Sequence, residues 1–323
     1  MTQAGAIDRA HRACETLTVP SGDVSLAVYA SGPPDAPCIV LVHGYPDSAR
    51  VWDAVRARLD NRFRVIVYDV RGAGASSAPA TLAGYRLEHL ACDLAAVADA
   101  TCGARPFHLV GHDWGSVQSW ESVTSPAFDG RIASFTSISG PSLDYAGVLL
   151  RESNRWKSAR ALFASMRQML QSTYIYFFLL PRLPEFAWRR LWAPTWTLWL
   201  RATEGLSTTA DPALLRNAIN GLGLYRANFV ERLRKPRARA THTPVQFIVP
   251  MRDRYVGPSL STGLDRWLGP HRRIELDATH WVLLSHADAV ARTVIEFIDE
   301  IPPRDAPLTR TISSVAPPGF STN

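Results

Sequence analysis

The chain has 323 residues, of which 46% are hydrophobic and 20% are charged, as in an ordinary globular protein. Its formal net charge of +6 comes mostly from arginines that are scattered among acidic residues. The densest basic run, Arg232 to Arg239, contains no aromatic residues, so it predicts an exposed hinge and not a nucleic-acid interface. No segment reaches the roughly 18 consecutive apolar residues that a membrane-spanning helix needs.

The amino-terminal residues 1–15 carry several charges and no apolar segment, unlike a secretory signal. The four cysteines form no Cys-x-x-Cys pair and have no metal-like spacing with histidine. We therefore expect a cytoplasmic protein whose reduced cysteines serve in packing. We expect neither a metal nor a cofactor.

Short strand patterns begin the chain. Residues 16–19 and 24–29 alternate in polarity around a turn and predict an antiparallel hairpin. The runs 38–42 and 64–68 are continuously apolar, which is typical of strands that helices cover on both faces. Between them, residues 51–59 place apolar side chains at helical spacing.

The same alternation continues to residue 138. Leu87 to Ala98 has the apolar spacing of a helix, and a strand ending near Gly111, a helix at 116–125 and a strand at 132–138 follow. Strands that alternate with helices predict parallel β-α-β units. We therefore expect an α/β fold with a mostly parallel central sheet, in which ligands bind beyond the carboxyl ends of the strands.

Residues 144–240 interrupt this alternation. They are helical in pattern, rich in arginine and heavily aromatic, which predicts an inserted helical cap. A pocket closed by this cap over the strand ends would be apolar. The sheet pattern then resumes, so residues 1–143 and 241–300 are expected to form the core.

The last part of the core should contain a strand at 245–249, a helix at about 259–268, an edge strand at 273–276 and a final helix at 287–298. Residues 301–323 are rich in proline, serine and threonine and have hardly a large apolar residue. Such a composition predicts a linker or a disordered tail.

A Gly-x-Asp-x-Gly turn, Gly111 to Gly115, joins the third predicted core strand to its helix. It has the form of a Gly-x-Ser-x-Gly nucleophile elbow, but Asp113 presents a carboxylate in place of a hydroxyl. A carboxylate suits attack on an electrophilic sp3 carbon and formation of an ester. Alone, Asp113 could equally cap the following helix.

Two further groups follow late strands in the order that this architecture imposes, an acid and then a histidine. Asp253 follows the strand at 245–249, and His280 lies in the loop after the edge strand. The order Asp113, Asp253, His280 therefore predicts a catalytic triad.

Each of these two positions has rivals. Asp144, at the entrance to the cap, is the alternative acid. His271 and His286 compete with His280, but His271 precedes the edge strand and His286 begins the last helix.

As a set, the motifs resemble the epoxide hydrolase and haloalkane dehalogenase branch of the α/β-hydrolase fold. The matching stretches are His43-Gly-Tyr-Pro46, Asp69-Val-Arg-Gly-Ala-Gly74, Gly111-His-Asp-Trp-Gly115, Asp253 and Thr279-His-Trp281. The cap and the proline-rich end are also similar to the hydrolase half of bacterial proteins that join an epoxide hydrolase to a short-chain dehydrogenase. The resemblance implies that the backbone N–H groups of Tyr45 and Trp114 form an oxyanion hole.

Epoxide hydrolysis and haloalkane dehalogenation, the two reactions of this branch, differ in their leaving group. An opened epoxide is an alkoxide that needs a proton, whereas a halide needs only N–H donors. In epoxide hydrolases two cap tyrosines supply the proton, and their stretches match Tyr174-Ile-Tyr-Phe-Phe178-Leu-Leu-Pro181 and Tyr225-Arg-Ala-Asn228. Leu179 departs from the glutamine that is usual there. The first donor is open between Tyr174 and Tyr176.

The sequence thus predicts an epoxide hydrolase that forms an ester on Asp113 and releases a vicinal diol from a lipophilic epoxide. A haloalkane dehalogenase is the nearest alternative, although many dehalogenases have an asparagine where this chain has Tyr45. A non-catalytic protein that binds a lipid or a signal is an alternative of another class. The expected partners are the epoxide and water, and the sequence is compatible with a homodimer and with peripheral membrane contact.

Overall fold

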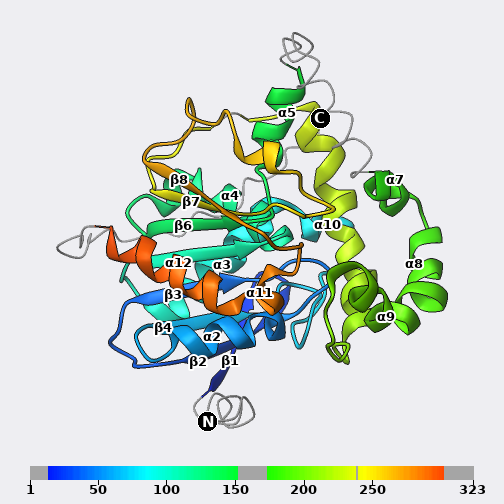
Figure 1. Ribbon diagram of the computed structural model, residues 1–323, viewed down its shortest axis with the longest axis horizontal. Coiled ribbons are helices and arrows are strands. Elements are labelled where there is room, and N and C mark those ends of the chain that lie inside the picture. The colour runs from blue at the N-terminus through cyan, green and yellow to red at the C-terminus, as the bar shows by residue number, and fades with distance from the viewer. Residues whose placement is uncertain (1–13, 152–172, 238, 302–323) are drawn as a thin grey trace.

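The computed structural model describes residues 14–151, 173–237 and 239–301. An eight-stranded sheet lies at its centre, in the order β1-β2-β4-β3-β5-β6-β7-β8 (Figure 1). The strands are β1 (Glu15–Ser21), β2 (Val24–Ser31), β3 (Cys38–Val42), β4 (Arg64–Tyr68), β5 (Phe107–His112), β6 (Ile132–Ile138), β7 (Val245–Pro250) and β8 (His271–Leu276). The pairs β1–β2 and β2–β4 are antiparallel, and all other neighbouring pairs are parallel. The predicted α/β fold is confirmed.

The central strand β3 shows why its sequence is apolar throughout. Successive side chains of a strand point to opposite faces, and here helices cover both. Ile39 and Leu41 pack in one cluster with residues of α2 (Asp53–Leu59) and α12 (Ala287–Asp299). Val40 packs in the other cluster with residues of α3 (Leu87–Cys102) and α4 (Trp114–Val123). The shorter elements of the core are η1 (Ala49–Trp52), η2 (Leu82–Tyr85), η3 (Pro126–Phe128), η6 (Pro258–Ser261) and α11 (Val282–Ser285).

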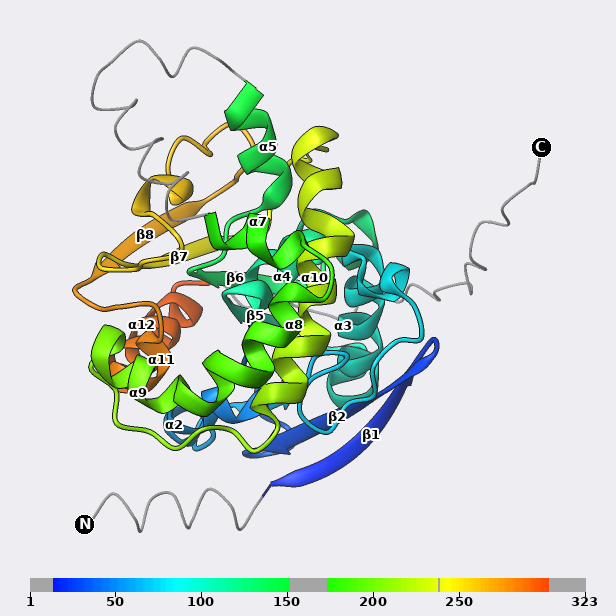
Figure 2. The ribbon, with the colours of Figure 1, turned by 90° about the vertical axis from the view of Figure 1, so that its right-hand side faces the viewer.

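Only helices are found among the described elements between β6 and β7. They are α5 (Leu143–Arg151), α7 (Thr173–Leu179), α8 (Leu183–Ala187), η5 (Trp188–Trp192), α9 (Ala193–Glu204) and α10 (Leu214–Arg234). Figures 1 and 2 show α7, α8 and α9 along one side of the molecule, with α10 between them and the core. This insertion therefore stands where the sequence predicted a cap. No helix within the described ranges combines the length and the hydrophobicity needed to cross a bilayer.

One predicted helix is wrong. Instead of a helix at 259–268, the chain forms the short 3-10 helix η6 and then turns. Thr262 is extended and Gly263 has a positive φ of 71°, and neither conformation continues a helix. The predicted tail lies almost entirely outside the described residues.

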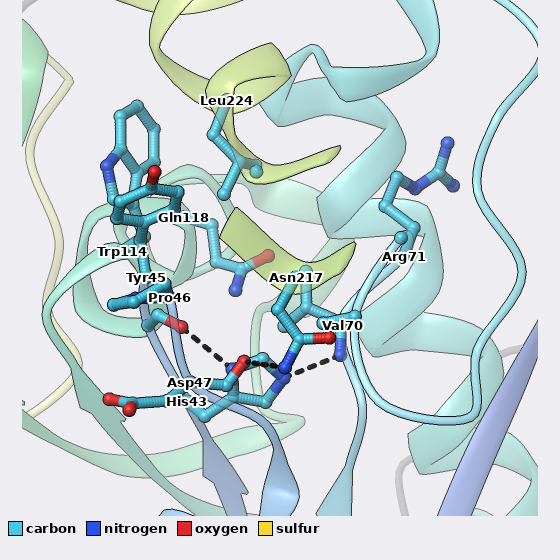
Figure 3. A pocket seen from close by; sticks show the side chains of 14 residues that line it. His43, Tyr45, Pro46, Asp47, Val70, Arg71, Trp114, Gln118, Asn217 and Leu224 are labelled. Atoms are coloured by element: carbon cyan, nitrogen blue, oxygen red, sulfur yellow. Dashed lines mark hydrogen bonds between the residues drawn. The ribbon is translucent and has the colours of Figure 1, made fainter. Parts of the chain in front are cut away.

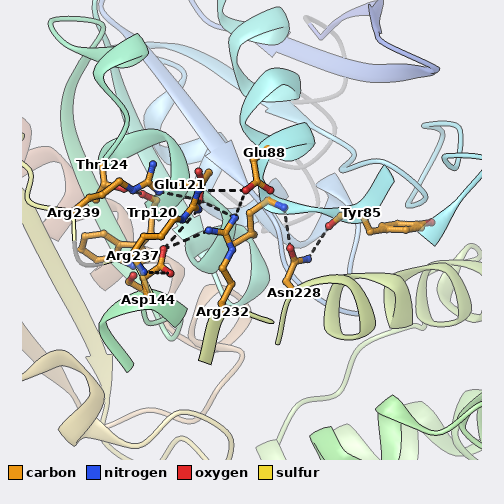
Figure 4. Close-up of polar contacts among 12 residues, drawn as sticks. Tyr85, Glu88, Trp120, Glu121, Thr124, Asp144, Asn228, Arg232, Arg237 and Arg239 are labelled. Atoms are coloured by element: carbon orange, nitrogen blue, oxygen red, sulfur yellow. Dashed lines mark hydrogen bonds and ion pairs between the residues drawn. The ribbon is translucent and has the colours of Figure 1, made fainter. Parts of the chain in front are cut away.

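The basic run at 232–239 is not a solvated hinge. Arg232 is buried. Arginines of the run form a shared network of ion pairs with one acid each from α3, α4 and α5 (Figure 4). The arginines are Arg232, Arg237 and Arg239, and the acids are Glu88, Glu121 and Asp144. These acids are far from the arginines in sequence, so no local pattern could pair them. The network joins the end of α10 to the core and to α5.

Candidate active site

The nucleophile elbow places Asp113 between β5 and α4 with a positive φ of 52°. Non-glycine residues rarely adopt this conformation, and it occurs where a sharp strand-to-helix turn exposes a reactive side chain. Neighbouring glycines make room for the turn. A Cβ at Gly44 would lie 2.3 Å from Asp113 Oδ1, and one at Gly115 would lie 2.0 Å from the carbonyl oxygen of Val42.

The two oxygens of Asp113 have different surroundings. Oδ1 accepts a hydrogen bond of 2.7 Å from the backbone N–H of Tyr45, and the nearby backbone N–H of Trp114 acts to lower the pKa of the same carboxyl. Oδ2 lies 3.7 Å from Nε2 of His280. One oxygen is thus held by the main chain, and the other faces the histidine.

His280 is held by the second predicted carboxylate. Its Nδ1 donates to Asp253 Oδ2 at 2.9 Å, and the backbone N–H groups of Tyr255 and Val256 donate to Oδ1 at 2.7 and 3.0 Å. The carbonyl oxygen of His280 also pairs with Nε2 of His112 at 3.0 Å. The structure therefore brings the three residues of the predicted triad together, with His280 between the carboxylates of Asp113 and Asp253.

The rival residues lie elsewhere. Asp144 accepts a hydrogen bond from the backbone N–H of Arg237 within the ion-pair network of Figure 4. His271 is bonded to the carbonyl oxygen of Gly269, and His286 is exposed. None of the three contacts Asp113.

Burial and charge act in opposite directions on the triad. Burial lowers the pKa of His280, but the carboxylates of Asp253, Asp113 and Glu204 outweigh it and raise this pKa to about 9. Burial also raises the pKa of Asp113, against the opposing effect of His280 and the two backbone N–H groups. For Asp253, by contrast, the nearby His280 outweighs burial and lowers the pKa of the carboxyl.

The two predicted cap tyrosines share a cavity with Asp113. Tyr174 on α7 and Tyr225 on α10 line the same cavity as Asp113, and their rings lie 6.2 Å apart. Burial, and then the charge of Asp113, raise the pKa of Tyr174 well above its ordinary value. Burial likewise raises that of Tyr225, so both phenols keep their protons at neutral pH. Tyr176 is 66% exposed and does not line the cavity.

The cavity above Asp113 has a volume of about 220 Å³. Ten of its fourteen lining residues are tyrosine, tryptophan or phenylalanine, and Asp113 and His280 supply its only carboxylate and imidazole. Trp188, Trp192, Trp196 and Trp199 come from the single helical run of η5 and α9. Such a lining accepts an apolar molecule and leaves its polar part to Asp113, His280 and the tyrosines.

Hydrogen bonds of the His43 ring fix the loop that carries Tyr45 (Figure 3). Nε2 of His43 accepts from the backbone N–H of Val70 at 2.9 Å, so Nδ1 carries the proton and donates to the carbonyl oxygen of Gly44 at 2.9 Å. Burial lowers the pKa of His43, which favours this neutral form. Asn217 of α10 donates to the carbonyl oxygen of Asp47 in the same loop.

Two acidic side chains near the triad were not predicted. Asp47 accepts a hydrogen bond of 3.0 Å from the indole N–H of Trp281, and burial raises its pKa to about 7. Glu204, at the end of α9, is 7% exposed and acts electrostatically on His280 and Tyr255. Asp47 directly follows the His-Gly-Tyr-Pro motif, which is a signal that could have been read, whereas nothing in the sequence marks Glu204.

Comparison of the sequence with models of protein families shows the family of the chain. A model of the alpha/beta hydrolase fold matches residues 37–287. The chain belongs to the α/β-hydrolase family. No group of three or more histidine, cysteine, aspartate or glutamate side chains in the described part of this hydrolase could hold a metal ion.

Individual relatives and solved structures are similar to the chain over different lengths. The chain is 35% identical over 290 residues to "Probable oxidoreductase EphD" of Mycobacterium tuberculosis. The aligned residues cover 85% of this hydrolase and 48% of the relative. It is 36% identical over 131 residues to "Epoxide hydrolase A" of the same organism, 40% of each chain. A crystal structure of an epoxide hydrolase from Bacillus megaterium superposes with a TM-score of 0.72 at 20% identity, over 88% of this hydrolase and all of that chain. The hydrolase thus spans about half the length of the curated EphD relatives that it matches.

Proposed function

We propose that this α/β-hydrolase is an epoxide hydrolase that converts a lipophilic epoxide and water into a vicinal diol. The observation that carries the proposal is the pairing of a carboxylate nucleophile with two protonated phenols across one aromatic cavity. A carboxylate attacks an sp3 carbon, and a phenol protonates the oxygen that this attack sets free. The names of the epoxide hydrolase relatives support the same reaction.

In the first step, Oδ2 of Asp113 attacks one epoxide carbon, and the carbon–oxygen bond of the ring breaks. Tyr174 or Tyr225 donates its proton to the departing oxygen. The product is a hydroxyalkyl ester of Asp113 beside one tyrosinate. The backbone N–H of Tyr45 donates to Oδ1 at 2.7 Å, which leaves Oδ2 as the oxygen that attacks.

The ester changes the acidity of His280. In the resting site the charge of Asp113 helps to raise the pKa of His280 to about 9, so the imidazole is protonated at neutral pH. Esterification removes that charge, and the pKa of His280 falls. The proton of His280 then passes to the tyrosinate. This transfer leaves the neutral imidazole that the second step requires.

In the second step, neutral His280 takes a proton from water, and the hydroxide adds to the ester carbonyl carbon of Asp113. The negative charge develops on Oδ1, to which the N–H of Tyr45 already donates, and the N–H of Trp114 acts on the same carboxyl. Collapse of this intermediate expels the diol oxygen, which takes the carboxyl proton. The site returns to ionised Asp113 beside protonated His280, so the protons balance over one turnover.

The proposal is tested with purified wild-type protein, styrene oxide and a haloalkane. We expect diol from styrene oxide, no halide release, and no turnover by an Asp113→Asn variant. An Asp129→Asn variant, changed at an exposed position after η3, is the control and should keep wild-type activity. Halide release without diol would show a dehalogenase, and tight binding of the epoxide without turnover would show a non-catalytic protein.

A further inference from the structure

One continuous helical run forms both the wall of the cavity and the outside of the insertion. It comprises α8, η5 and α9, from Leu183 to Glu204. Its inner side carries the four tryptophans that line the cavity. Figure 2 shows α8 and α9 turned toward the viewer, in front of α10 and of the core.

The exposed side of this run and of the preceding α7 is unusually apolar. Six of the nine large hydrophobic side chains that are exposed in the described ranges come from α7, α8, η5, α9 and the turn after α7: Tyr176, Leu180, Leu183, Phe186, Leu191 and Leu198. Phe186 is 58% exposed and Leu198 is 66% exposed. Isolated hydrophobic residues on a surface are ordinary, but a group of this kind indicates an interaction site.

Four exposed arginines lie among these apolar residues in the sequence. Arg182, Arg189, Arg190 and Arg201 are all exposed, and none forms an ion pair with a described residue. Glu185 is the only acidic residue in the sequence from 173 to 203, and Arg226 neutralises it with a contact of 2.6 Å. The four exposed arginines therefore outnumber the single acidic residue of this segment, which interacts with Arg189 and is paired with Arg226.

The helical spacing puts apolar side chains beside arginines. Phe186 and Arg190 are four residues apart, and Leu198 and Arg201 are three apart, so each pair shares a helix face. We call the six apolar residues and the four arginines the outer cap face. It has the composition of an amphipathic surface that lies in a membrane interface, with aromatic and aliphatic side chains beside cations.

We propose that the outer cap face docks on the surface of an anionic lipid bilayer. The apolar side chains would enter the boundary between headgroups and acyl chains, and the guanidinium groups would bind the lipid phosphates. A second copy of this chain fits the face poorly. A two-fold contact would bring two sets of four unpaired arginines together, and like charges repel.

The position of the outer cap face on the cavity wall links membrane docking to the supply of substrate. This link rests on the proposed function. The helical run that would touch the bilayer is also the wall of the aromatic cavity. A lipophilic epoxide dissolved in the bilayer would therefore be separated from Asp113 by one layer of helix. The substrate class inferred is an epoxide that partitions into lipid.

The test is flotation of the full chain with vesicles of phosphatidylcholine alone and with an equimolar mixture of phosphatidylcholine and phosphatidylglycerol. We expect binding to the mixed vesicles and its loss at high salt. Replacing Phe186 and Leu198 with serine should weaken binding roughly tenfold per side chain, and replacing Arg190 and Arg201 with glutamine roughly fivefold per charge. A Leu82→Ser variant removes a side chain that is 51% exposed on η2, outside the face, and should bind like the wild type.

Three results would overturn the proposal. The wild type could fail to float with the mixed vesicles, or the Phe186→Ser/Leu198→Ser variant could float as well as the wild type. Sedimentation velocity could also show a dimer that this variant dissociates, which would make a second copy the occupant. Hydrolysis of styrene oxide in solution is measured in parallel and should not change in the variant. Because flotation needs no catalysis, a failure of the proposed activity leaves this test intact.

Discussion

Replacing Asp253 with asparagine separates the two chemical steps. Oδ2 of Asp253 lies 2.9 Å from Nδ1 of His280. At that distance and an effective dielectric constant of ~20, a pair of unit charges interacts by about 6 kcal/mol, or roughly four pK units. The substitution would then bring the pKa of His280 from about 9 in the wild type to roughly 5.

The geometry of the imidazole would change as well. Asp253 accepts the proton of Nδ1, which leaves Nε2 free to take a proton from water. An asparagine can turn its amide N–H toward Nδ1 and select the opposite tautomer. We therefore expect hydrolysis of the ester to slow on the order of 10⁴-fold, as when a triad histidine is held in the wrong tautomer. Attack by Asp113 should slow far less.

The assay is rapid mixing with styrene oxide, followed by quenching and intact-protein mass spectrometry. Asp253→Asn should show a burst of ester that then decays slowly. Asp144→Asn, which changes the rival acid, should accumulate no ester. Wild-type rates of ester hydrolysis in Asp253→Asn would refute the role given to this carboxylate, and accumulation in Asp144→Asn would reassign it.

Three further predictions concern the cavity and its pH dependence. Tyr174→Phe and Tyr225→Phe should each lower the rate of ester formation by about 10²–10⁴-fold, measured in the same burst experiment, and unchanged bursts would remove the tyrosines from the mechanism. Because burial raises the pKa of Asp113, kcat/KM should begin to fall with decreasing pH at a higher pH than an ordinary aspartate would give, and a profile flat to pH ~4 would contradict this. Glu204→Gln should lower the pKa of His280, because it removes one of the charges that raise it, and NMR titration of the imidazole would show a shift toward lower pH.

The position of the triad could be anticipated because it depends on topology. In a parallel sheet the carboxyl ends of the strands meet at one edge, so residues that follow β5, β7 and β8 converge whatever their distance in sequence. Asp113, Asp253 and His280 each follow one of these strands. Strand patterns and chain order were therefore sufficient to propose them.

Other features depend on packing that no local pattern encodes. Tyr174 and Tyr176 are two residues apart on α7, so they point to different sides of the helix, and only the docking of α7 on α10 decides which one meets the cavity. Glu204 acts on His280 because the end of α9 packs against Trp281, which directly follows His280 in the chain. The ion pairs of Arg232 depend on acids that are far away in the sequence.

The covalent role of Asp113 is the central claim, and one isotope experiment tests it most directly. A single turnover is run in water enriched in the heavy oxygen isotope, with the enzyme in excess over the epoxide. If water attacks the ester carbonyl, the label appears in the peptide that contains Asp113, and the diol from this first turnover is unlabelled. Label in the diol with none in Asp113 would show direct attack of water on the epoxide and would contradict the account.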